Sequence, residues 1–535
     1  MPNKHPSAFE PKILIINIVV SLLGVIIGLE LISRLGITTN TSIIGALIAI
    51  LVARIPLTFL RDFSNLHKQN LMQTAISSAT FTAGNALFLP IAVPWLLNRV
   101  DLIWPMFMGA TLACCVSMTL VYRLFDSRVF PAKNPWPPGI ATAETLIAAA
   151  KKGKRALLLG YGAVAGVVSQ YFFKIPADIA GIAWIGNVWA LTMFGVGLVV
   201  RGYSTQLIGV DINTYYLPHG MMIGAGLVAL IQIILLISKK EKKKEREEGR
   251  KKEERLALTR SEKEFGSGLS KSLIVYTLIA MLLAVFGGLY SDMSLPMFIL
   301  WILFAAFAAM ISQLIVGLSA MHAGWFPAFA VALIFLVIGI LIGFPAPALG
   351  LLVGFSAAAG PAFADMGYDL KTGWILRGRG KDKSFELEGR KQQYFAELTG
   401  LVVAVAIVAL FARYYLLQDL VPPVARVYAL TIERGASPKI AMYLLLWAIP
   451  GGVIQAVGGP NRQLGILFST GLLIMNPLAG VTCLVAIGIR LLVKHVYKEE
   501  GEKTLYILAA GLIAGSALTS FVTSTLGLGG GRKIL

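Results

Sequence analysis

The sequence predicts an all-α polytopic membrane protein of about sixteen transmembrane helices, arranged as two related halves of about eight helices each. Three observations lead to this fold class. Of the 535 residues, 56% are hydrophobic and only 14% are charged, whereas soluble globular chains carry about a quarter charged residues. Apolar runs near the length of a bilayer span recur from residue 12 to residue 528. Finally, features of the first half return in the second half in the same order.

The expected spans follow one another with short loops. In the first half they cover residues 12–33, 37–60, 71–97, 102–125, 155–173, 179–200, 217–237 and 272–290. In the second half they cover residues 297–317, 324–344, 346–364, 394–417, 440–459, 463–475, 478–493 and 504–528. The first run is too long for the core of a signal peptide and is expected to be a retained helix.

The net charge of +19 comes from short loops and one linker between the apolar runs. Such a distribution is typical of cytoplasmic loops under the positive-inside rule. It argues against nucleic-acid binding, because no basic patch with exposed aromatic residues lies on a soluble module. The linker, residues 238–271, alternates lysine and arginine with glutamate, and we expect a solvated cytoplasmic segment without chemistry of its own.

The two halves are predicted to be repeats, residues 1–290 and residues 291–535. The double proline Pro137–Pro138 returns as Pro422–Pro423, an offset of 285 residues (422 − 137). Corresponding loops of both halves carry positive charge, which favours parallel over inverted repeats, although both remain open. If every segment crossed the membrane simply, the positive loops would fall on opposite sides, so at least one segment per half is expected to dip into the membrane and return. Spans 71–97 and 346–364 are the candidates for such re-entrant or broken segments, because they are rich in small and polar residues that also suit helix-to-helix contact.

Residues 134–156, NPWPPGIATAETLIAAAKKGKRA, predict a short helix that begins at a proline pair and cannot span the membrane. Its first turn would point backbone N–H groups at an anionic ligand group, while Glu144 would offer a proton or cation site. The alternative is that Glu144 pairs with a nearby lysine at the membrane surface. The sequence leaves both interpretations open.

Other polar residues lie inside apolar runs, where burial is costly unless it is useful. Tyr216 and His219 flank Pro218, and Asn476 stands beside Pro477 at the matching place of the second half. These pairs indicate either proton coupling at a broken helix or an interfacial Tyr and His near a helix end. Glu30 and Gln313 occupy nearly equivalent positions, 283 residues apart (313 − 30).

Two further groups have competing interpretations. His322, with Trp325 and Pro327, marks a short break that indicates ligand contact or an interfacial aromatic belt. Asp365 and Asp369 follow the expected span 346–364, where they could cap the next turn as easily as bind a ligand.

Motifs of enzymes are missing from the sequence. It contains no phosphate-binding G-x-x-x-x-G-K-[ST] loop, no H-E-x-x-H, no C-x-x-C and no G-x-S-x-G. The three cysteines lie inside apolar runs and are expected to pack there rather than bind metal. We therefore expect no enzyme activity, no cofactor and no metal site. Broken helices, buried polar groups and paired halves indicate secondary transport.

Several segments resemble one known family. NPWPPGIATAETL is similar to the proline-glycine, Ala-x-Ala-Glu signature of the oligopeptide transporter (OPT) superfamily, which includes the yellow-stripe-like metal-chelate transporters. HKQNLMQTAISSA, DMGYDLKTGWILRG, GRKQQYFAELTG and GLIAGSALTSFV agree with the family in the same order. The resemblance extends from about residue 12 to residue 528 and is most specific at the Asp-Leu-Lys-Thr-Gly and Lys-Gln-Gln blocks.

The resemblance implies a transporter of the OPT type, of about sixteen helices that arose by duplication. It implies small peptides, their derivatives or metal chelates as substrates, carried in symport with protons. The family motifs fall on Pro138, Gly139 and Glu144, and on Asp369, Lys371, Lys391 and Gln392. Two departures leave the substrate open, a charged insertion between Lys371 and Lys391, and His322 with Trp325 in place of an Asn/Ser-rich turn.

The sequence therefore predicts a proton-coupled symporter of small peptides or metal chelates, a multi-pass protein of the cell membrane. The residues expected to contact substrate and protons are Glu144, Tyr216, His219, Gln313 and Asn476, with Glu30 and His322 behind them. The competing functions are a passive channel and a membrane-embedded lipid-linked transferase. The lipid bilayer and a small-molecule substrate are the expected partners, and the oligomeric state is left open, with a homo-oligomer as one option.

Overall fold

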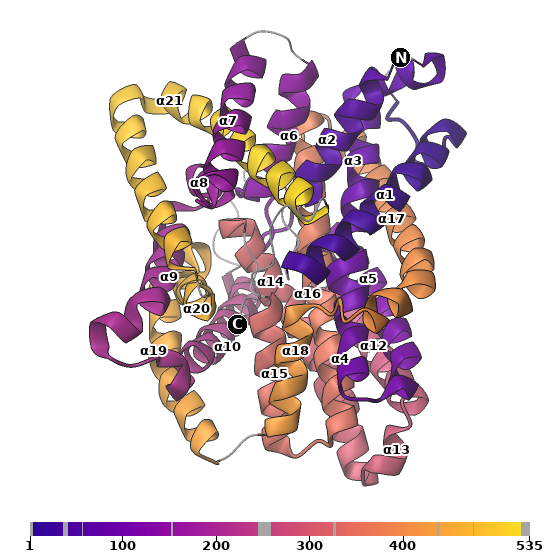
Figure 1. The fold of residues 1–535 in the computed structure, drawn as a ribbon, viewed down its shortest axis with the longest axis vertical. Helices are drawn as coiled ribbons and strands as arrows, with labels where there is room; N and C mark the ends of the chain where they lie inside the picture. The colour runs from indigo at the N-terminus through magenta and orange to yellow at the C-terminus, as the bar shows by residue number, and fades with distance from the viewer. Residues whose placement is uncertain are drawn as a thin grey trace.

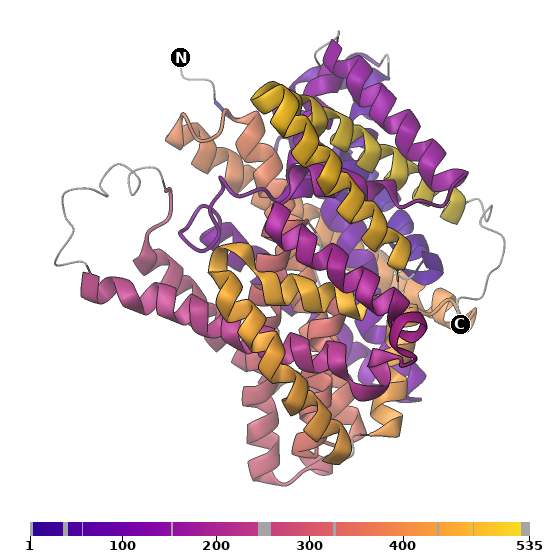
Figure 2. The ribbon, with the colours of Figure 1, turned by 90° about the vertical axis from the view of Figure 1, so that its left-hand side faces the viewer.

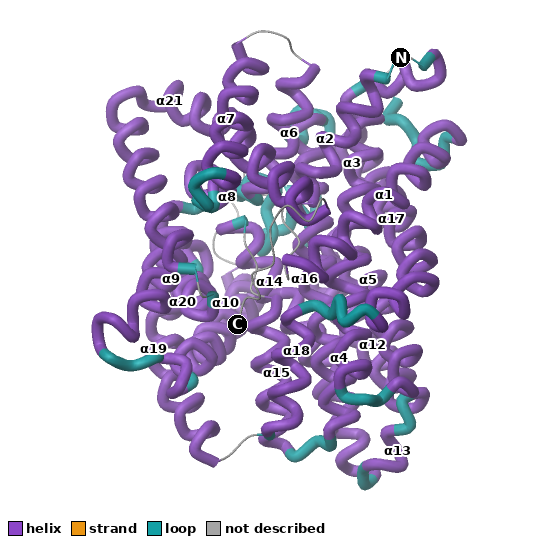
Figure 3. The backbone as a smooth tube through the Cα atoms, in the orientation of Figure 1, coloured by secondary structure: helices purple, strands orange, loops and turns teal. Residues whose placement is uncertain are grey.

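The protein is described by a computed structural model that covers residues 4–35, 41–55, 57–150, 154–243, 258–324, 328–435, 438–474 and 476–525. These residues form an all-helical bundle, with helices joined by short loops and no strand among the described segments (Figures 1 and 3). Helices are the expected solution for such apolar runs, because lipid offers no partner to an open backbone and a helix satisfies its own N–H and C=O groups.

Nine helical segments of the described chain are long and apolar enough to cross a membrane. They are Pro11–Ser33, Leu66–Leu96, Val100–Leu124, Glu262–Phe286, Leu295–His322, Ala346–Leu376, Lys383–Leu417, Met442–Gly459 and Pro477–Glu502. Shorter apolar helices of 10–17 residues lie between them, at Thr41–Arg54, Leu157–Tyr171, Leu217–Ala229, Val331–Ile342, Leu464–Leu473 and Thr504–Ser516. The prediction of an all-α polytopic membrane protein is confirmed.

The helices of the first part of the chain lie on both sides of the bundle in Figure 1. Helices α1 and α5 lie on the right, and α9 lies on the left beside α19. Up to the linker the helices are α1 (Pro11–Leu35), α2 (Thr41–Arg54), η1 (Thr58–Ser64), α3 (Leu66–Phe81), η2 (Thr82–Phe88), α4 (Leu89–Leu96), η3 (Val100–Leu102), α5 (Ile103–Leu124), α6 (Pro137–Ala150), α7 (Lys154–Tyr171), α8 (Ala177–Ile185), α9 (Val188–Ile208), η4 (Ile212–Tyr215) and α10 (Leu217–Lys243).

The second part of the chain continues the bundle beyond the linker. Its helices are α12 (Glu262–Phe286), α13 (Leu289–Asp292), α14 (Leu295–Ala323), α15 (Ala328–Ile342), α16 (Ala346–Leu376), α17 (Lys383–Leu417), α18 (Pro423–Arg434), α19 (Pro438–Arg462), α20 (Leu464–Leu473) and α21 (Pro477–Thr525). Figure 2 shows that α10 projects beyond its neighbours at its C-terminal end, where the charged linker begins. Helix α12 begins inside the predicted linker, because Ser261 and Glu264 form a capping box there.

The two segments expected to be re-entrant run on as continuous helices, so that expectation is wrong. Leu66–Leu96 and Ala346–Leu376 each extend over 31 residues without turning back. In the first, the π-helical turn η2 joins α3 to α4. In the second, Pro361 lies inside α16 without ending it. The small residues serve close helix contact instead, and neighbouring helices hold the backbone where a proline removes a hydrogen bond.

One helix break that the sequence did not predict lies inside an expected span. The expected span 179–200 is two helices, α8 and α9, that separate at Gly186 and Asn187. Asn187 caps α9 by accepting a hydrogen bond from the Ala190 N–H (3.2 Å). Arg490 of α21 donates to the carbonyl oxygens of Ala183 (3.2 Å) and Gly186 (2.6 Å), which the break leaves free. A basic side chain from the far end of the sequence therefore stabilises this break.

Two pairs of helices pack through glycines, which allows their backbones to approach closely. In α10, a Cβ atom at Gly224 would overlap the carbonyl of Ala448 in α19. In α7, Gly162 and Gly166 face the backbone of α21 in the same way. Small residues at such crossings are typical of helix association in membranes, where van der Waals contact rather than exclusion of water drives packing.

The N-terminal segment before α1 docks on the start of α17. The Ala8 N–H donates to the Gln392 side-chain oxygen (2.8 Å). The His5 ring is 5% exposed and lies 5.3 Å from His67 and 5.2 Å from Phe385, measured between ring centroids. Burial, as the largest cause, lowers the pKa of His5 from 6.5 to about 4, and the nearby Arg377 charge acts in the same direction.

Acidification is expected to release this N-terminal segment. Because the docked state binds a proton at His5 more weakly than the released state, docking is fully stabilised above pH 6.5 and weakens as the pH falls from 6.5 to about 4. Hydrogen exchange at Ala8, corrected for the intrinsic pH dependence, should be faster at pH 5 than at pH 7.5. The His5→Asn variant should lose this difference, and equal acceleration in both proteins would contradict the role of His5.

Candidate functional site

A cavity of about 690 Å³ lies where α6, the α8–α9 break, the end of α16 and α21 meet. Five of its lining residues have acidic or basic side chains, namely Lys133, Glu144, Lys371, Arg379 and Arg490. Trp189, Trp374 and Tyr506 add aromatic surface to the same walls. We call this space the basic cavity, because four of those five side chains are cationic.

The double proline and the glycine after it bring α6 onto α16. Helix α6 begins at Pro137. A Cβ atom at Gly139 would lie 2.5 Å from the carbonyl oxygen of Tyr368 and 2.8 Å from the Cβ of Lys371, so only glycine allows this approach. The Thr372 hydroxyl donates to the Gly139 carbonyl oxygen (3.1 Å). The Pro-Pro-Gly and Asp-Leu-Lys-Thr-Gly segments thus build one corner of the cavity together.

Lys371 is a buried cation on the cavity wall, with 3% of its surface exposed. Its ammonium donates to the carbonyl oxygens of Ala132 (2.7 Å) and Asn134 (2.9 Å) and lies 4.4 Å from the centroid of the Trp374 ring. Among the described residues, no carboxylate lies within ion-pair distance of this ammonium. Its positive charge is therefore oriented but not neutralised by an ion pair, and it can attract an anionic group.

The other charged residues divide the cavity into an open and a closed part. Lys133 and Arg379 are exposed and mark its opening, whereas Arg490 is 7% exposed and Glu144 is 9% exposed. Arg490 also pairs with Glu502 across the kink of α21 at Lys498 (Nη2 to Oε1, 3.1 Å). A small molecule in this space would meet cations and one acid at fixed positions.

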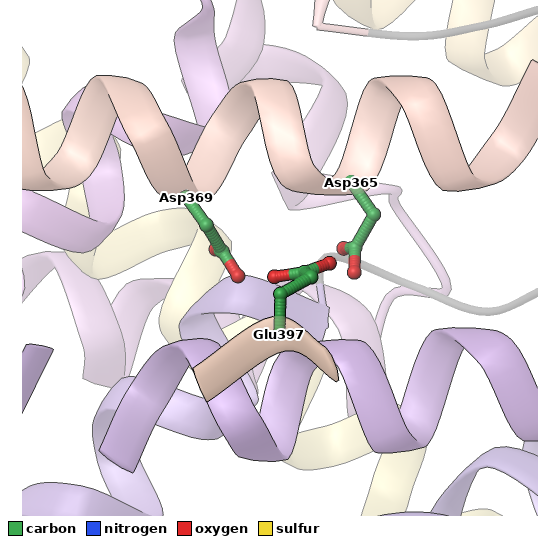
Figure 4. A group of neighbouring side chains, drawn as sticks. All are labelled: Asp365, Asp369 and Glu397. Atoms are coloured by element: carbon green, nitrogen blue, oxygen red, sulfur yellow. The ribbon is translucent and has the colours of Figure 1, made fainter. Parts of the chain in front are cut away.

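A second polar group lies deeper in the bundle. Asp365 and Asp369 are one turn apart on α16, and Glu397 faces them from α17 (Figure 4). One oxygen from each carboxyl group lies within 4.8 Å of the other two. The exposed fractions are 2%, 0% and 0%, so the three carboxyls are shielded from solvent. We call these three residues the carboxyl triad.

Helices α2 and α3 supply uncharged donors to the triad. Each aspartate accepts its hydrogen bonds at a single oxygen, Oδ1. The donors are Thr41 (2.8 Å) and Ser77 (3.0 Å) to Asp365, and Ser42 (2.7 Å) and Gln73 (2.6 Å) to Asp369. The second oxygen of each aspartate, and both carboxyl oxygens of Glu397, receive no hydrogen bond from the described residues.

Comparison with protein families identifies the family of this chain. The family described as OPT oligopeptide transporter protein matches residues 10–214 and 179–526, which together cover most of the chain. The chain belongs to the OPT oligopeptide transporter family. Members of the OPT family are transporters rather than enzymes, and the resemblance noted in the sequence is confirmed. No curated protein sequence matches the chain.

In this OPT family member, two of the residues proposed from sequence lie at or beside the basic cavity. Glu144 is part of its wall. His322 is 4% exposed at the end of α14, and its carbonyl oxygen accepts a hydrogen bond from the Asn187 N–H (2.8 Å), where Asn187 also lines the cavity. Its partners in the predicted break, Trp325 and Pro327, lie outside the described residues.

The remaining proposed residues are not brought to the basic cavity. Tyr216 and His219 lie together at the start of α10, with ring centroids 5.8 Å apart. Pro218 stands in the first turn of α10 rather than at a break inside a helix, and Pro477 likewise begins α21. Asn476 is exposed and caps α21 by accepting from the Ala479 N–H (3.0 Å).

Gln313 and Glu30 each contact a different part of the bundle. Gln313 is fully buried in α14, and its side-chain oxygen accepts from the hydroxyls of Ser117 (2.7 Å) and Tyr276 (3.0 Å). Glu30 of α1 accepts a hydrogen bond from the Tyr415 hydroxyl of α17 (2.9 Å). These contacts tie neighbouring helices together.

From the sequence, Asp365 and Asp369 could cap the next turn as easily as bind a ligand, and Glu397 was not singled out. Helix α16 continues to Leu376, so Asp365 and Asp369 lie inside it and do not cap a following turn. The signal that was present is the spacing of four residues, which puts both carboxyls on one helix face. Glu397, in a Phe-Ala-Glu segment, gives no local sign that it faces them.

Proposed function

We propose that this OPT family member is a proton-coupled symporter of the cell membrane that carries small peptides, peptide-like molecules or metal chelates. The observation that carries the proposal is the basic cavity, a partly enclosed space with four cations and one acid inside a bundle of membrane-spanning helices. Charged side chains at such a place are costly and are retained where they serve transport.

The charges of the cavity are complementary to a peptide or an aminocarboxylate chelate. A peptide carries a carboxylate at one end and an ammonium at the other. Lys371 and Arg490 supply cations on the buried side for the carboxylate, and Glu144 supplies an anion for the ammonium. The carboxylates of a metal chelate fit the same cations, so both substrate classes share one binding chemistry. His322, behind Asn187, would hold the wall of this site.

The proposal includes two repeats, residues 1–290 and 291–535, of about eight segments each. Support comes from the order of helices, since an offset of 285 residues (422 − 137) relates α6 to α18. The same offset brings α1 onto α14, α2 onto α15, and α7 onto α19. Helix α7 packs on α21, and helix α10 packs on α19. Each of these contacts joins a helix of the first repeat to a helix of the second, as expected for two related bundles. Rocking of one bundle against the other would expose the cavity to each side in turn.

The role of Glu144 is tested with the full chain in proteoliposomes. For labelled trialanine, Glu144→Gln is expected to raise the KM about 10- to 100-fold, because the ammonium loses a charged partner. For N-acetyl-trialanine, which has no ammonium, the KM should change little. Glu433→Gln, an exposed acid on α18, is the matched control. An equal change for both peptides would remove Glu144 from substrate binding.

Counterflow separates the symporter from a passive channel. Trialanine or zinc–nitrilotriacetate loaded inside the vesicles should accelerate uptake of the labelled molecule from outside, and an inward proton gradient should drive its accumulation. A channel would show neither effect. Failure of both probes to enter would contradict the proposed substrate classes.

A further inference from the structure

The carboxyl triad has no neighbouring positive charge, among the described residues, that would neutralise it. If Asp365, Asp369 and Glu397 were all ionised, three negative charges would face one another in a site shielded from solvent. Among the described residues, no lysine or arginine lies within ion-pair distance of any of them. Isolated charges in such surroundings are neutralised by a proton or by a bound cation.

The hydrogen bonds indicate whether a proton or a bound cation neutralises the carboxyl triad. The four donors from α2 and α3 are all directed at the Oδ1 atoms of the two aspartates. Four oxygens are left without a donor, Oδ2 of Asp365, Oδ2 of Asp369, and Oε1 and Oε2 of Glu397. Figure 4 shows the Glu397 carboxyl between the two aspartates. Protons on these oxygens would turn facing acceptors into carboxyl-to-carboxyl hydrogen bonds and satisfy them together.

We propose that the carboxyl triad is the coupling-proton site of the transporter, where Glu397 shares protons with Asp365 and Asp369 and exchanges them with solvent during the transport cycle. Uptake of a proton converts a carboxylate to a carboxylic acid, and its release restores the carboxylate. The inference rests on the proposed function and adds the place where the proton binds, which is separate from the basic cavity.

The groups around the triad favour titration of the triad itself. Helix α2 contributes Thr41 and Ser42, and helix α3 contributes Gln73, Ser77 and Ser78, which carry no charge at physiological pH. On α16, Tyr368 lies nearby, and on α17 Gln393 donates to the Asp369 carbonyl oxygen (2.7 Å). The three carboxyls are therefore the groups whose charge changes in this part of the bundle.

Helix α16 links the triad to the substrate site. Asp369 faces α2 and α3, whereas Lys371, two residues later and on nearly the opposite helix face, lines the basic cavity. Thr372 joins the same turn to α6. Loss of a proton would leave like charges facing each other across α16 and α17, which favours their separation. A shift of α16 would then change the position of Lys371, so proton binding and substrate binding can be coupled through one rigid element.

Infrared spectroscopy of the purified full chain tests the protonation directly. The wild type at pH 7 should show a carboxylic-acid C=O band that shifts in D₂O. Glu397→Gln, Asp369→Asn and Asp365→Asn, which keep side-chain shape, should each reduce or shift this band, while Glu433→Gln should leave it unchanged. Elution on gel filtration checks that each variant is folded. If every triad variant misfolds, the wild-type spectrum decides, and its lacking a protonated carboxyl at pH 7 would overturn the proposal.

A metal ion is the competing occupant, since three carboxyls and neighbouring hydroxyls are also hard oxygen ligands. Thermal unfolding of the wild type should be the same in NaCl, CaCl₂ and MnCl₂ solutions matched in ionic strength to a choline chloride reference. A midpoint that rises with one of these cations, and does so only when Glu397 is intact, would replace the proton by that metal ion.

Transport separates this inference from the proposed function. In Asp369→Asn and Glu397→Gln, the proton gradient should no longer drive accumulation of trialanine, while counterflow of trialanine persists. Full gradient-driven accumulation in both variants would overturn the triad as the coupling site. If wild-type accumulation itself ignores the proton gradient, the proposed symport fails, and the infrared result still decides whether the triad holds protons.

Discussion

Replacing Glu386 with glutamine is expected to destabilise the protein by about 3–5 kcal/mol, because it leaves two buried guanidinium groups without their shared carboxylate. Arg377 donates to Glu386 through Nε (2.8 Å) and Nη2 (3.1 Å), and Arg390 donates through Nε (2.7 Å). All three side chains have 0% exposure. Few single changes in the described chain would leave as much buried charge without a partner.

Loss of this ionic cluster would destabilise several parts of the bundle, because the cluster connects them. Arg390 also contacts Asp126 (3.3 Å) after α5, and donates to the Thr259 hydroxyl (2.7 Å) in the charged linker, just before α12. Arg377 donates to the side-chain oxygen of Gln393 (2.7 Å). The cluster thus connects the loop after α5, the residues before α12, and the turn between α16 and α17. That turn holds the charged insertion noted in the sequence, which is a folded part of the protein.

Glu388 provides a matched control, since it lies two residues away on the same helix. Its side chain is 43% exposed, pairs loosely with Lys391 (3.9 Å), and accepts a hydrogen bond from the Gln392 amide (2.6 Å) that a glutamine oxygen can also accept. Glu388→Gln should therefore change stability by less than about 1 kcal/mol. Unfolding midpoints in detergent, measured by near-ultraviolet circular dichroism, compare the two variants. Equal midpoints would show that the Glu386 cluster contributes little beyond an exposed pair.

The sequence was sufficient for most of the membrane-spanning helices, because a long apolar run has one low-energy conformation in lipid. Pro11–Ser33, Val100–Leu124 and Leu295–His322 lie close to their expected limits. The start of α17 at Lys383 was not expected, since residues 383–393 are strongly polar. Glu386 and Arg390 of this stretch are buried, and Arg377 and Asp126, from other parts of the chain, pair with them.

The candidate site was predictable only in part for a similar reason. Glu144, which was proposed from the proline-rich segment 134–156, lies on the cavity wall. Lys371, which also lines the cavity, was named only through the family resemblance. The carboxyl triad was not predicted as a group, because an acid near the end of an apolar run can cap the next turn as easily as bind a ligand. Its role depends on Glu397 and on hydroxyls from α2 and α3, and no local pattern shows that these helices surround α16.

Lys371→Met is expected to raise the KM for trialanine about 10- to 100-fold, because the carboxylate of the peptide loses a buried cation. Methionine keeps the length of the side chain and its packing against Trp374 but removes the ammonium. The KM for trialanine amide, which has no terminal carboxylate, should change little. This pair of substrates separates lost charge recognition from general damage to the cavity, which would weaken both.

Lys391→Met is the control for Lys371→Met, since Lys391 belongs to the same family motifs but has a half-exposed side chain outside the cavity. Both variants remove one positive charge from the chain, so any effect of net charge on association with the membrane surface is matched. Lys371 also donates to the carbonyls of Ala132 and Asn134, and unfolding midpoints must show that the cavity wall survives their loss. Identical KM values for trialanine in the two variants would place the anion-binding cation elsewhere, with Arg490 the next to be tested because it is the other buried cation on the wall.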